Sequence, residues 1–158
     1  MTLLNKIIQT PLTRLYSKYI EEIEQGKKTF FRDFELPVAA LLAVSMKRRF
    51  SVVIVPGDEE AEAFANDCRS FGLDAEIFPW WKTLPYRPLD ASAEIFSQRC
   101  RALSHILSAP APYVLVVTMR ALMTPVPAPD YMSRLQTSIK TGDRLHVNSF
   151  TELLETWG

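Results

Sequence analysis

Apolar residues recur at steps of three and four along the first part of the chain, which is the spacing of one face of an α-helix. Pro11 donates no backbone N–H, so it must either interrupt this helix or begin a second one. Gly26 is expected to end the second helix. The pattern therefore predicts N-terminal helices over residues 1–26, followed by a short strand candidate at residues 29–34.

The middle of the chain alternates between apolar runs and amphipathic segments. Three runs are strand candidates: residues 51–55, 75–78 and 113–117. The first and last are continuous apolar runs, which are typical of strands covered on both faces. Helices are predicted at residues 37–48, 58–71, about 92–107 and 119–123. Strands that alternate with helices predict βαβ units, and hence an α/β fold with a mostly parallel sheet flanked by helices.

Polar residues mark the expected helix starts. Asp58 is expected to cap the helix after the first of these strands, and Asp90 or Ser92 to open the next one. Thr118 is expected to cap the short helix before Pro125. The predicted apolar stripe of the helix at 92–107 consists of Ile95, Phe96, Cys100, Leu103 and Leu107.

The C-terminal part has a different pattern. Prolines at 125, 127 and 129 predict a stiff extended linker, and residues 141–143 predict a turn. Residues 149–152 fit a capping box before an apolar helix face that has no later partner. We therefore expect the chain to end inside a second unit. The predicted domains are N-terminal helices at 1–26, an α/β domain at 27–128, and a linker with the beginning of a second α+β subdomain at 129–158.

The composition excludes several classes of protein. The net charge is zero, with 18 basic and 18 acidic residues, so bulk charge does not indicate a nucleic-acid binder. Two separated cysteines and two histidines argue against a zinc site and suit a reducing cytoplasm. No apolar run is long enough to cross a membrane, and the charged N-terminus does not resemble a signal peptide. We expect a soluble cytoplasmic protein without a membrane partner.

The strand-to-helix junctions lack the chemistry that binds nucleotides. Residues 34–39, after the first predicted strand, contain no glycine, lysine or hydroxyl group with which to hold phosphate or magnesium. The next junction, at residues 56–60, presents three carboxylates, which would repel phosphate. We therefore predict no catalytic, cofactor-binding or metal-binding residue in this chain. The alternative is a nucleotide- or DNA-binding α/β domain with an unusual site around Asp58 and Glu60.

Partner contacts are predicted near the segment FPWWKTLPY, residues 78–86. Its two prolines favour a stiff connector, in which adjacent tryptophans point to opposite sides so that one is core and one exposed. A basic run at 47–49 could touch DNA phosphate, and Arg99 could bind a partner or pair with Glu94 or Glu76. The candidate partner-contact residues are Trp80, Trp81, Arg87 and Arg99.

Several motifs together resemble one family over roughly residues 30–158. They are Phe78-Pro79-Trp80 followed by Leu84-Pro85-Tyr86, Ser97-Gln98-Arg99 with Leu103 and Leu107, Val114–Val117 with Ala121-Leu122, and Gly142-Asp143-Arg144-Leu145. Their order and spacing resemble the N-terminal module of bacterial transcription-repair coupling factors (Mfd), which is itself similar to the excision-repair protein UvrB. The resemblance implies a degenerate RecA-like (P-loop) domain without its phosphate-binding loop.

The resemblance also implies a function for the whole protein. Such a factor is an ATP-driven DNA translocase that displaces stalled RNA polymerase and recruits UvrA for nucleotide excision repair. ATP, magnesium, duplex DNA and the polymerase would be bound by regions outside this chain. The residues that engage UvrA in the family would follow Gly158, so no UvrA-contact residue can be assigned here. The chain itself is expected to be a non-catalytic scaffold.

Overall fold

The computed structural model describes residues 11–32, 34–46, 50–83, 92–108, 112–137, 139–144 and 146–157. The chain divides into two compact units, Met1–Pro125 and Val126–Gly158. The domain boundaries predicted from the sequence stay predictions.

The first unit is built on a parallel sheet of three strands, β1 (Phe50–Val55), β2 (Asp74–Phe78) and β3 (Tyr113–Thr118). The strand order is β1-β3-β2, and the register places Val52 and Glu76 on either side of Leu115. Every residue of the central strand β3 is buried, as its continuous apolar run predicted. The α/β class predicted from the sequence is therefore confirmed.

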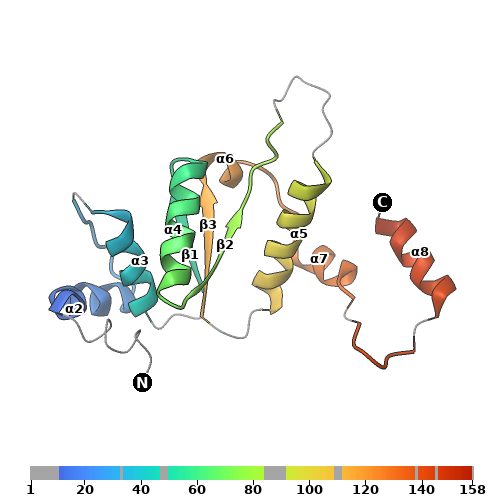
Figure 1. Ribbon diagram of the computed structural model, residues 1–158, viewed down its shortest axis with the longest axis horizontal. Helices are drawn as coiled ribbons and strands as arrows, with labels where there is room; N and C mark the ends of the chain where they lie inside the picture. The colour runs from blue at the N-terminus through green and yellow to red at the C-terminus, as the bar shows by residue number, and fades with distance from the viewer. Residues whose placement is uncertain are drawn as a thin grey trace. The chain divides into compact units, whose positions relative to one another are not determined.

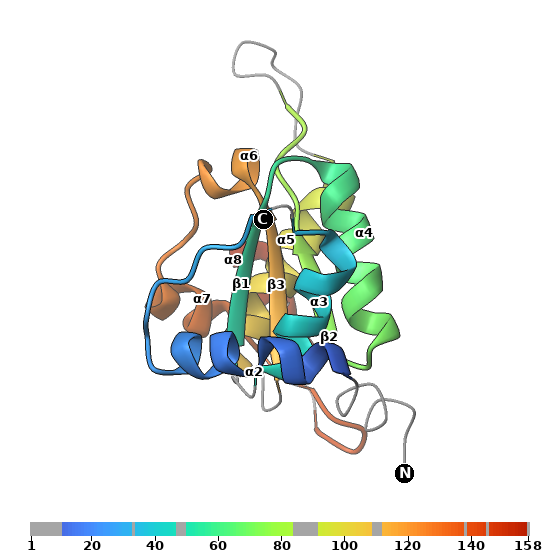
Figure 2. The same ribbon diagram turned by 90° about the vertical axis from the view of Figure 1, so that its left-hand side faces the viewer.

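Helices cover the two faces of this sheet (Figures 1 and 2). Helices α3 (Leu36–Ser45) and α4 (Asp58–Ser70) pack together against one face, where Ala40, Phe64 and Cys68 are buried. Helix α5 (Ala93–Ser108) covers the other face, where Ala102 and Leu115 are buried. Two apolar layers therefore hold the sheet, and β2 and β3 lie between them.

Strand β1 is covered on one face only, so the prediction that it is buried on both faces is wrong. Phe50, Val52 and Ile54 lie on the face that carries α5, and their exposed fractions are 38%, 49% and 51%. The reason is the strand order, because α5 packs over β2 and β3 and does not reach the edge strand β1. A β-branched composition therefore occurs both in the buried strand β3 and in the half-exposed strand β1.

The N-terminal helix α2 (Pro11–Glu24) begins at Pro11 and is followed by Gly26 at φ +78°, as predicted. The strand predicted at residues 29–34 is wrong, because the described residues 27–32 and 34–35 form neither helix nor strand. Phe31 and Phe34 stack at 4.7 Å between ring centroids, and both lie against Tyr16 of α2. Aromatic packing against α2 thus replaces sheet pairing. The helix expected before Pro11 lies outside the described residues.

The predicted helix caps are only partly confirmed. Thr118 accepts a hydrogen bond from the Ala121 N–H at 3.2 Å and caps helix α6 (Met119–Leu122). Ser92 opens α5 by accepting from the Ile95 N–H at 3.2 Å. Asp58 does not cap α4. It is the first residue of that helix, and the N-cap position belongs to Gly57.

The apolar stripe predicted for α5 is partly wrong. Ile95 is buried as expected, but the exposed fractions of Phe96 and Leu107 are 54% and 38%. Arg99 and Ala102 are buried in their place, with exposed fractions of 3% and 0%. The helix is rotated so that a cation and a small residue face the sheet, which spacing and hydropathy alone could not indicate.

The second unit contains two helices, α7 (Pro129–Leu135) and α8 (Val147–Trp157). The prediction of an extended linker that includes Pro129 is wrong at this residue, because Pro129 occupies the first turn of α7. The predicted turn is confirmed, with Gly142 at φ +99° and a 3.0 Å hydrogen bond from Asp143 N–H to the Lys140 carbonyl. The predicted capping box is wrong, because α8 begins at Val147 and Ser149 lies inside its first turn.

None of the helices in the described part of the chain combines the length and the apolar character needed to cross a membrane.

Candidate functional site

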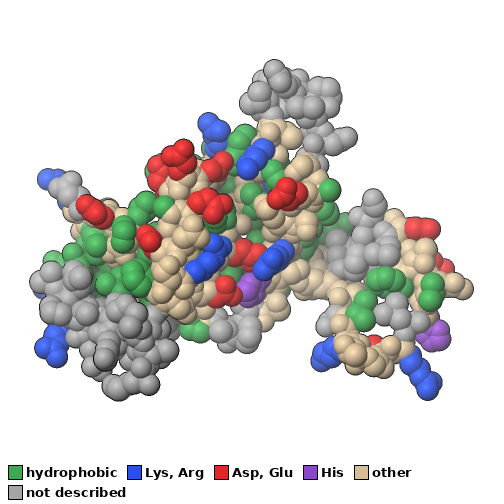
Figure 3. Space-filling view, viewed as in Figure 1, with side chains coloured by type: hydrophobic (Ala, Val, Ile, Leu, Met, Phe, Trp, Pro, Cys, Tyr) green, Lys and Arg blue, Asp and Glu red, His purple; other side chains and the backbone are tan. Residues whose placement is uncertain are grey.

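A groove runs along the open edge of β2, between α4 and α5. It has a volume of about 530 Å³. Only Ala75, Ile77 and Pro79 contribute apolar side chains, and the other lining residues are charged or polar. Charged side chains of both signs gather over the space between the two helices (Figure 3). A groove with this lining differs from the mostly apolar pockets that hold small molecules.

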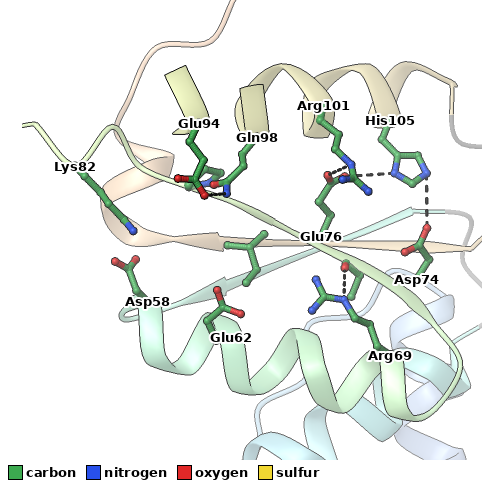
Figure 4. Close-up of a pocket in the computed structure, with 13 residues that line it drawn as sticks. Asp58, Glu62, Arg69, Asp74, Glu76, Lys82, Glu94, Gln98, Arg101 and His105 are labelled. Carbon is green, nitrogen blue, oxygen red and sulfur yellow. Dashed lines mark hydrogen bonds and ion pairs between the residues drawn. The ribbon is translucent and has the colours of Figure 1, made fainter. Parts of the chain in front are cut away.

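Carboxylates dominate the end of the groove that lies at the carboxyl end of β2. Asp58 and Glu62 project from α4, and Glu94 projects from α5 (Figure 4). Glu94 accepts a 3.3 Å hydrogen bond from Gln98, one turn later on the same helix. Lys82 lies at this end and supplies the one cation among these side chains (Figure 4).

A hydrogen-bonded network centred on Glu76 lies at the other end of the groove (Figure 4). Its carboxylate accepts from the Tyr113 hydroxyl at 2.9 Å and pairs with Arg101 Nε at 3.2 Å. His105 lies between two carboxylates, with Nδ1 3.3 Å from Glu76 and Nε2 3.8 Å from Asp74. Burial, together with the hydrogen bond to Glu76 and its negative charge, raises the pKa of Tyr113, so this hydroxyl remains a proton donor.

Arg69 reaches from α4 to the backbone of β2. Its Nε donates a 3.0 Å hydrogen bond to the Ala75 carbonyl, and its Nη1 donates to Asn66 at 3.0 Å. The guanidinium therefore occupies a position where a neighbouring strand would donate an N–H. Among the described residues β2 pairs only with β3, so the side of β2 that Arg69 contacts is a free sheet edge.

Arg99, a predicted partner-contact residue, is placed inside the domain. Its guanidinium donates to the Pro79 carbonyl at 2.6 Å, to Thr124 Oγ1 at 3.1 Å and to the Pro125 carbonyl at 3.4 Å. These bonds tie the segment after β2 to the segment after α6. The suggested pairing of Arg99 with Glu94 or Glu76 is wrong, because Arg99 bonds to these carbonyls and to Thr124. Glu94 accepts from Gln98, and Glu76 pairs with Arg101.

Two aromatic rings complete the environment of Arg99. The centre of its guanidinium lies 4.1 Å from the centroid of Phe78 and 4.3 Å from that of Trp81. A cation held over aromatic faces and bonded to carbonyls can stay charged although it is buried. Burial lowers the pKa of Arg99 from its usual value, but an arginine stays protonated in proteins.

Trp80 and Trp81 are both half-buried, so the prediction of one core and one exposed tryptophan is wrong. Trp80 Nε1 donates to Asp58 at 3.2 Å, and its ring lies 5.2 Å from the guanidinium of Arg120. Trp81 stacks on Phe96 with ring centroids 6.4 Å apart. Neither tryptophan is fully exposed, because both rings contact residues of the same unit. The partner-contact role of Trp80, Trp81 and Arg99 stays a prediction.

Two predicted features of this region lie outside the described residues: Arg87 and the basic run at 47–49. Of the two acidic residues proposed for an unusual site, Asp58 lines the groove and Glu60 is not among its lining residues. Asp58 lines the groove with Glu62, whereas Glu60 turns back toward Gly57, where an added Cβ would lie 2.9 Å from Glu60 Oε2. The described residues hold no group of three His, Cys, Asp or Glu side chains suited to a metal ion.

Sequence reasoning missed Glu76, Arg101 and His105 as members of one site. Glu76 lies on β2, whereas Arg101 and His105 lie on α5, and His105 follows Glu76 by 29 residues, so only the packing of α5 over β2 joins them. One signal was available. Arg101 and His105 are four residues apart and so share a helix face.

The fold and groove define an α/β domain with a parallel sheet and a polar cleft at one sheet edge. This chain is similar to the transcription-repair-coupling factor of Haemophilus influenzae, with 30% identity over 128 residues. The match covers 78% of this chain but only 11% of that protein, so the chain spans a small part of the relative's length. No family profile and no solved structure matches the chain.

Proposed function

We propose that this chain is an α/β module of a transcription-repair coupling factor and acts there as a non-catalytic scaffold. The observation that carries the proposal is the 30% identity to a protein of that name over 128 residues, which include most of the α/β unit. In the whole protein, an ATP-driven motor outside this chain would displace stalled RNA polymerase, and UvrA would be recruited for repair. ATP, magnesium and duplex DNA would bind outside this chain.

The first turns of the helices support a non-catalytic role. A phosphate site needs several free backbone N–H groups and a cation at the start of a helix that follows a strand. The first turn of α3 contains Pro37 and no charged residue, and the described residues before it form no strand. The first turn of α4 carries Asp58, Glu59 and Glu60, whose charges oppose phosphate. A RecA-like domain that has lost its phosphate loop fits these features.

The uncovered face of β1 supports a scaffold role. Val52 and Ile54 are about half exposed beside the half-exposed Phe50, and together they form an apolar strip on the sheet. Contiguous exposed apolar surface in a soluble domain marks a contact with another protein segment. A module inside a large multidomain protein would use such a strip against its neighbours.

A titration with a fluorescent ATP analogue tests the non-catalytic part of the proposal. The chain, with magnesium present, is expected to show no saturable binding. Tight magnesium-dependent binding would contradict the proposal and favour the alternative of a nucleotide-binding domain.

The double variant Asp58→Ala/Glu60→Ala serves as the companion measurement. If the chain binds the analogue and the double variant does not, the unusual acidic site is the binding site. A matched double variant at Glu21 and Glu24, exposed residues of α2, controls for the loss of two negative charges.

A further inference from the structure

The edge of β2 offers unpaired backbone groups at the floor of the groove. In a strand, the N–H and carbonyl of one residue point to the same side, and those of the next residue point to the other side. The Ala75 carbonyl accepts a hydrogen bond from the Arg69 side chain of α4, which indicates that this carbonyl faces the open edge. Ile77, two residues on, must present its N–H and carbonyl to the same edge. The described residues supply no second strand there.

Arg69 occupies the edge by donating a hydrogen bond to the Ala75 carbonyl. Proteins protect exposed sheet edges with charged side chains that block pairing with other chains. Arg69 satisfies one edge carbonyl with a single hydrogen bond at 3.0 Å, and its side chain is exposed at the surface. An incoming strand can displace it, because its guanidinium can return to water without leaving a buried charge.

The side chains along the edge indicate the chemistry of the incoming strand. Asp74 and Glu76 point to the α5 side, whereas Ala75 and Ile77 point to the α4 side and pack in or against the apolar core. Opposite charges across neighbouring strands are favourable and like charges are not. A strand beside β2 therefore pairs best if basic residues alternate with apolar residues.

The charge of the whole groove agrees with that pattern. Its lining includes five carboxylates, Asp58, Glu62, Asp74, Glu76 and Glu94, against three cations, Arg69, Lys82 and Arg101. The same carboxylates argue against a second copy of this chain as the occupant. Pairing β2 with β2 would place Asp74 and Glu76 near their counterparts.

We propose that the β2 edge is a strand-addition site for an extended peptide segment of a partner, with Lys or Arg at alternate positions and apolar residues between them. Backbone hydrogen bonds to Ala75 and Ile77 would give affinity, and the acidic lining would select the charge. This inference stands on the groove alone and does not depend on the proposed function.

The test uses a fluorescein-labelled, acetylated peptide of alternating Lys and Val, eight residues long, and fluorescence anisotropy with the full chain. Saturable binding is expected. An alternating Glu and Val peptide is expected to bind at least about tenfold more weakly, because every basic residue becomes acidic. Absence of saturable binding of the Lys peptide, or equal binding of the two peptides, would overturn the proposal.

Backbone methylation separates strand addition from simple charge attraction. Two versions of the Lys peptide carry N-methyl groups on either the Lys or the Val residues. Because alternate N–H groups of a strand point to opposite edges, one pattern blocks pairing and the other leaves it intact. One version is expected to lose at least about tenfold in affinity while the other keeps it. An equal effect of both patterns would overturn the proposal.

Two variants locate the site on the chain. Arg69→Ala frees the edge carbonyl and is expected to tighten binding severalfold for the parent peptide, but not for the pairing-blocked version. Glu62→Lys is expected to weaken binding severalfold, whereas Glu59→Lys, on the same helix but outside the groove lining, is expected to leave it unchanged. Arg69→Ala without effect, or Glu59→Lys as damaging as Glu62→Lys, would place the peptide elsewhere and overturn the proposal.

Discussion

Arg99 shows how one residue can join separate segments of a domain. It is a buried cation with an exposed fraction of 3%, and it contacts the segment after β2 and the segment after α6 at once. Its charge is compensated by carbonyl oxygens, a hydroxyl group and two aromatic faces rather than by a carboxylate. Planar stacking with several directed donors is a task for arginine and not for lysine.

Arg99→Ala is expected to lower the free energy of unfolding by about 2–4 kcal/mol, because it leaves carbonyls unpaired and removes the stack on Phe78. Arg99→Lys is expected to recover less than half of that loss, since an ammonium cannot replace the planar fork. Urea unfolding of the chain measures both values. Arg101→Ala, two residues away with a side chain 82% exposed, is the control and is expected to cost less than about 1 kcal/mol. Equal losses at the two positions would contradict the internal role of Arg99.

Because the thiol of Cys68 is buried, we expect the free energy of unfolding of the chain to fall at alkaline pH. Its side chain is fully buried, and burial, with a smaller effect from Asp67, raises its pKa from 9.0 to about 11. The unfolded chain therefore loses this proton above pH 9 while the folded chain keeps it, so stability falls as pH rises from about 9 to 11. The expected loss is about 2–3 kcal/mol.

Urea unfolding at pH 8, 9, 10 and 11 measures this loss. Cys68→Ala is expected to be less stable at pH 8 but to show a shallower decline, with the remainder due to Tyr113, whose pKa is also raised. A decline as steep in Cys68→Ala as in the unchanged chain would show that the buried thiol is not responsible.

At the scale of elements, sequence pattern predicted the existence and type of most helices and strands of the α/β unit. Continuous apolar runs marked β1 and β3, and Thr118 and Gly26 marked a helix start and a helix end. The errors arose where tertiary packing decides. Phe31 and Phe34, from the segment predicted as a strand, pack on Tyr16 of α2 instead of joining the sheet, and β1 is an edge rather than a central strand among the described residues.

The site was less predictable than the fold, for a physical reason. The groove exists because α4 and α5 flank the free edge of β2, and strand order is a non-local property. Arg99 was predicted to contact a partner or a carboxylate, whereas its partners include backbone carbonyls, which no sequence pattern displays.

The uncovered face of β1 is expected to tolerate a polar substitution with little loss of stability. Val52→Thr is expected to change the free energy of unfolding by less than about 0.5 kcal/mol, because 49% of this side chain is already exposed. Val114→Thr on the neighbouring β3 is expected to cost about 1.5–3 kcal/mol, because it buries a hydroxyl at a position that is 1% exposed. Urea unfolding of both variants compares the same change in adjacent strands. Similar losses of unfolding free energy in the two variants would contradict the exposure of Val52 on β1.

At the scale of the whole molecule, the α/β unit presents two chemically different surfaces at the edge strands of its sheet. The first turns of α3 and α4 oppose phosphate binding, and exposed apolar and acidic surfaces lie at the two edges of the sheet. The β1 edge presents an apolar strip, and the β2 edge presents backbone groups between carboxylates. Two chemically different edges would let one small sheet contact two different partners.

The most direct test of the central claim is a chimera of the Haemophilus influenzae coupling factor, in which this chain replaces the segment that aligns with it. The chimera is expressed in cells that lack their own factor, beside the intact factor and a version with the segment deleted. The measurement is the rate of repair of the transcribed strand relative to the other strand after ultraviolet damage. The chimera is expected to restore faster repair of the transcribed strand, whereas the deletion is not. A chimera that accumulates to the level of the intact factor but repairs both strands alike would contradict the proposed function.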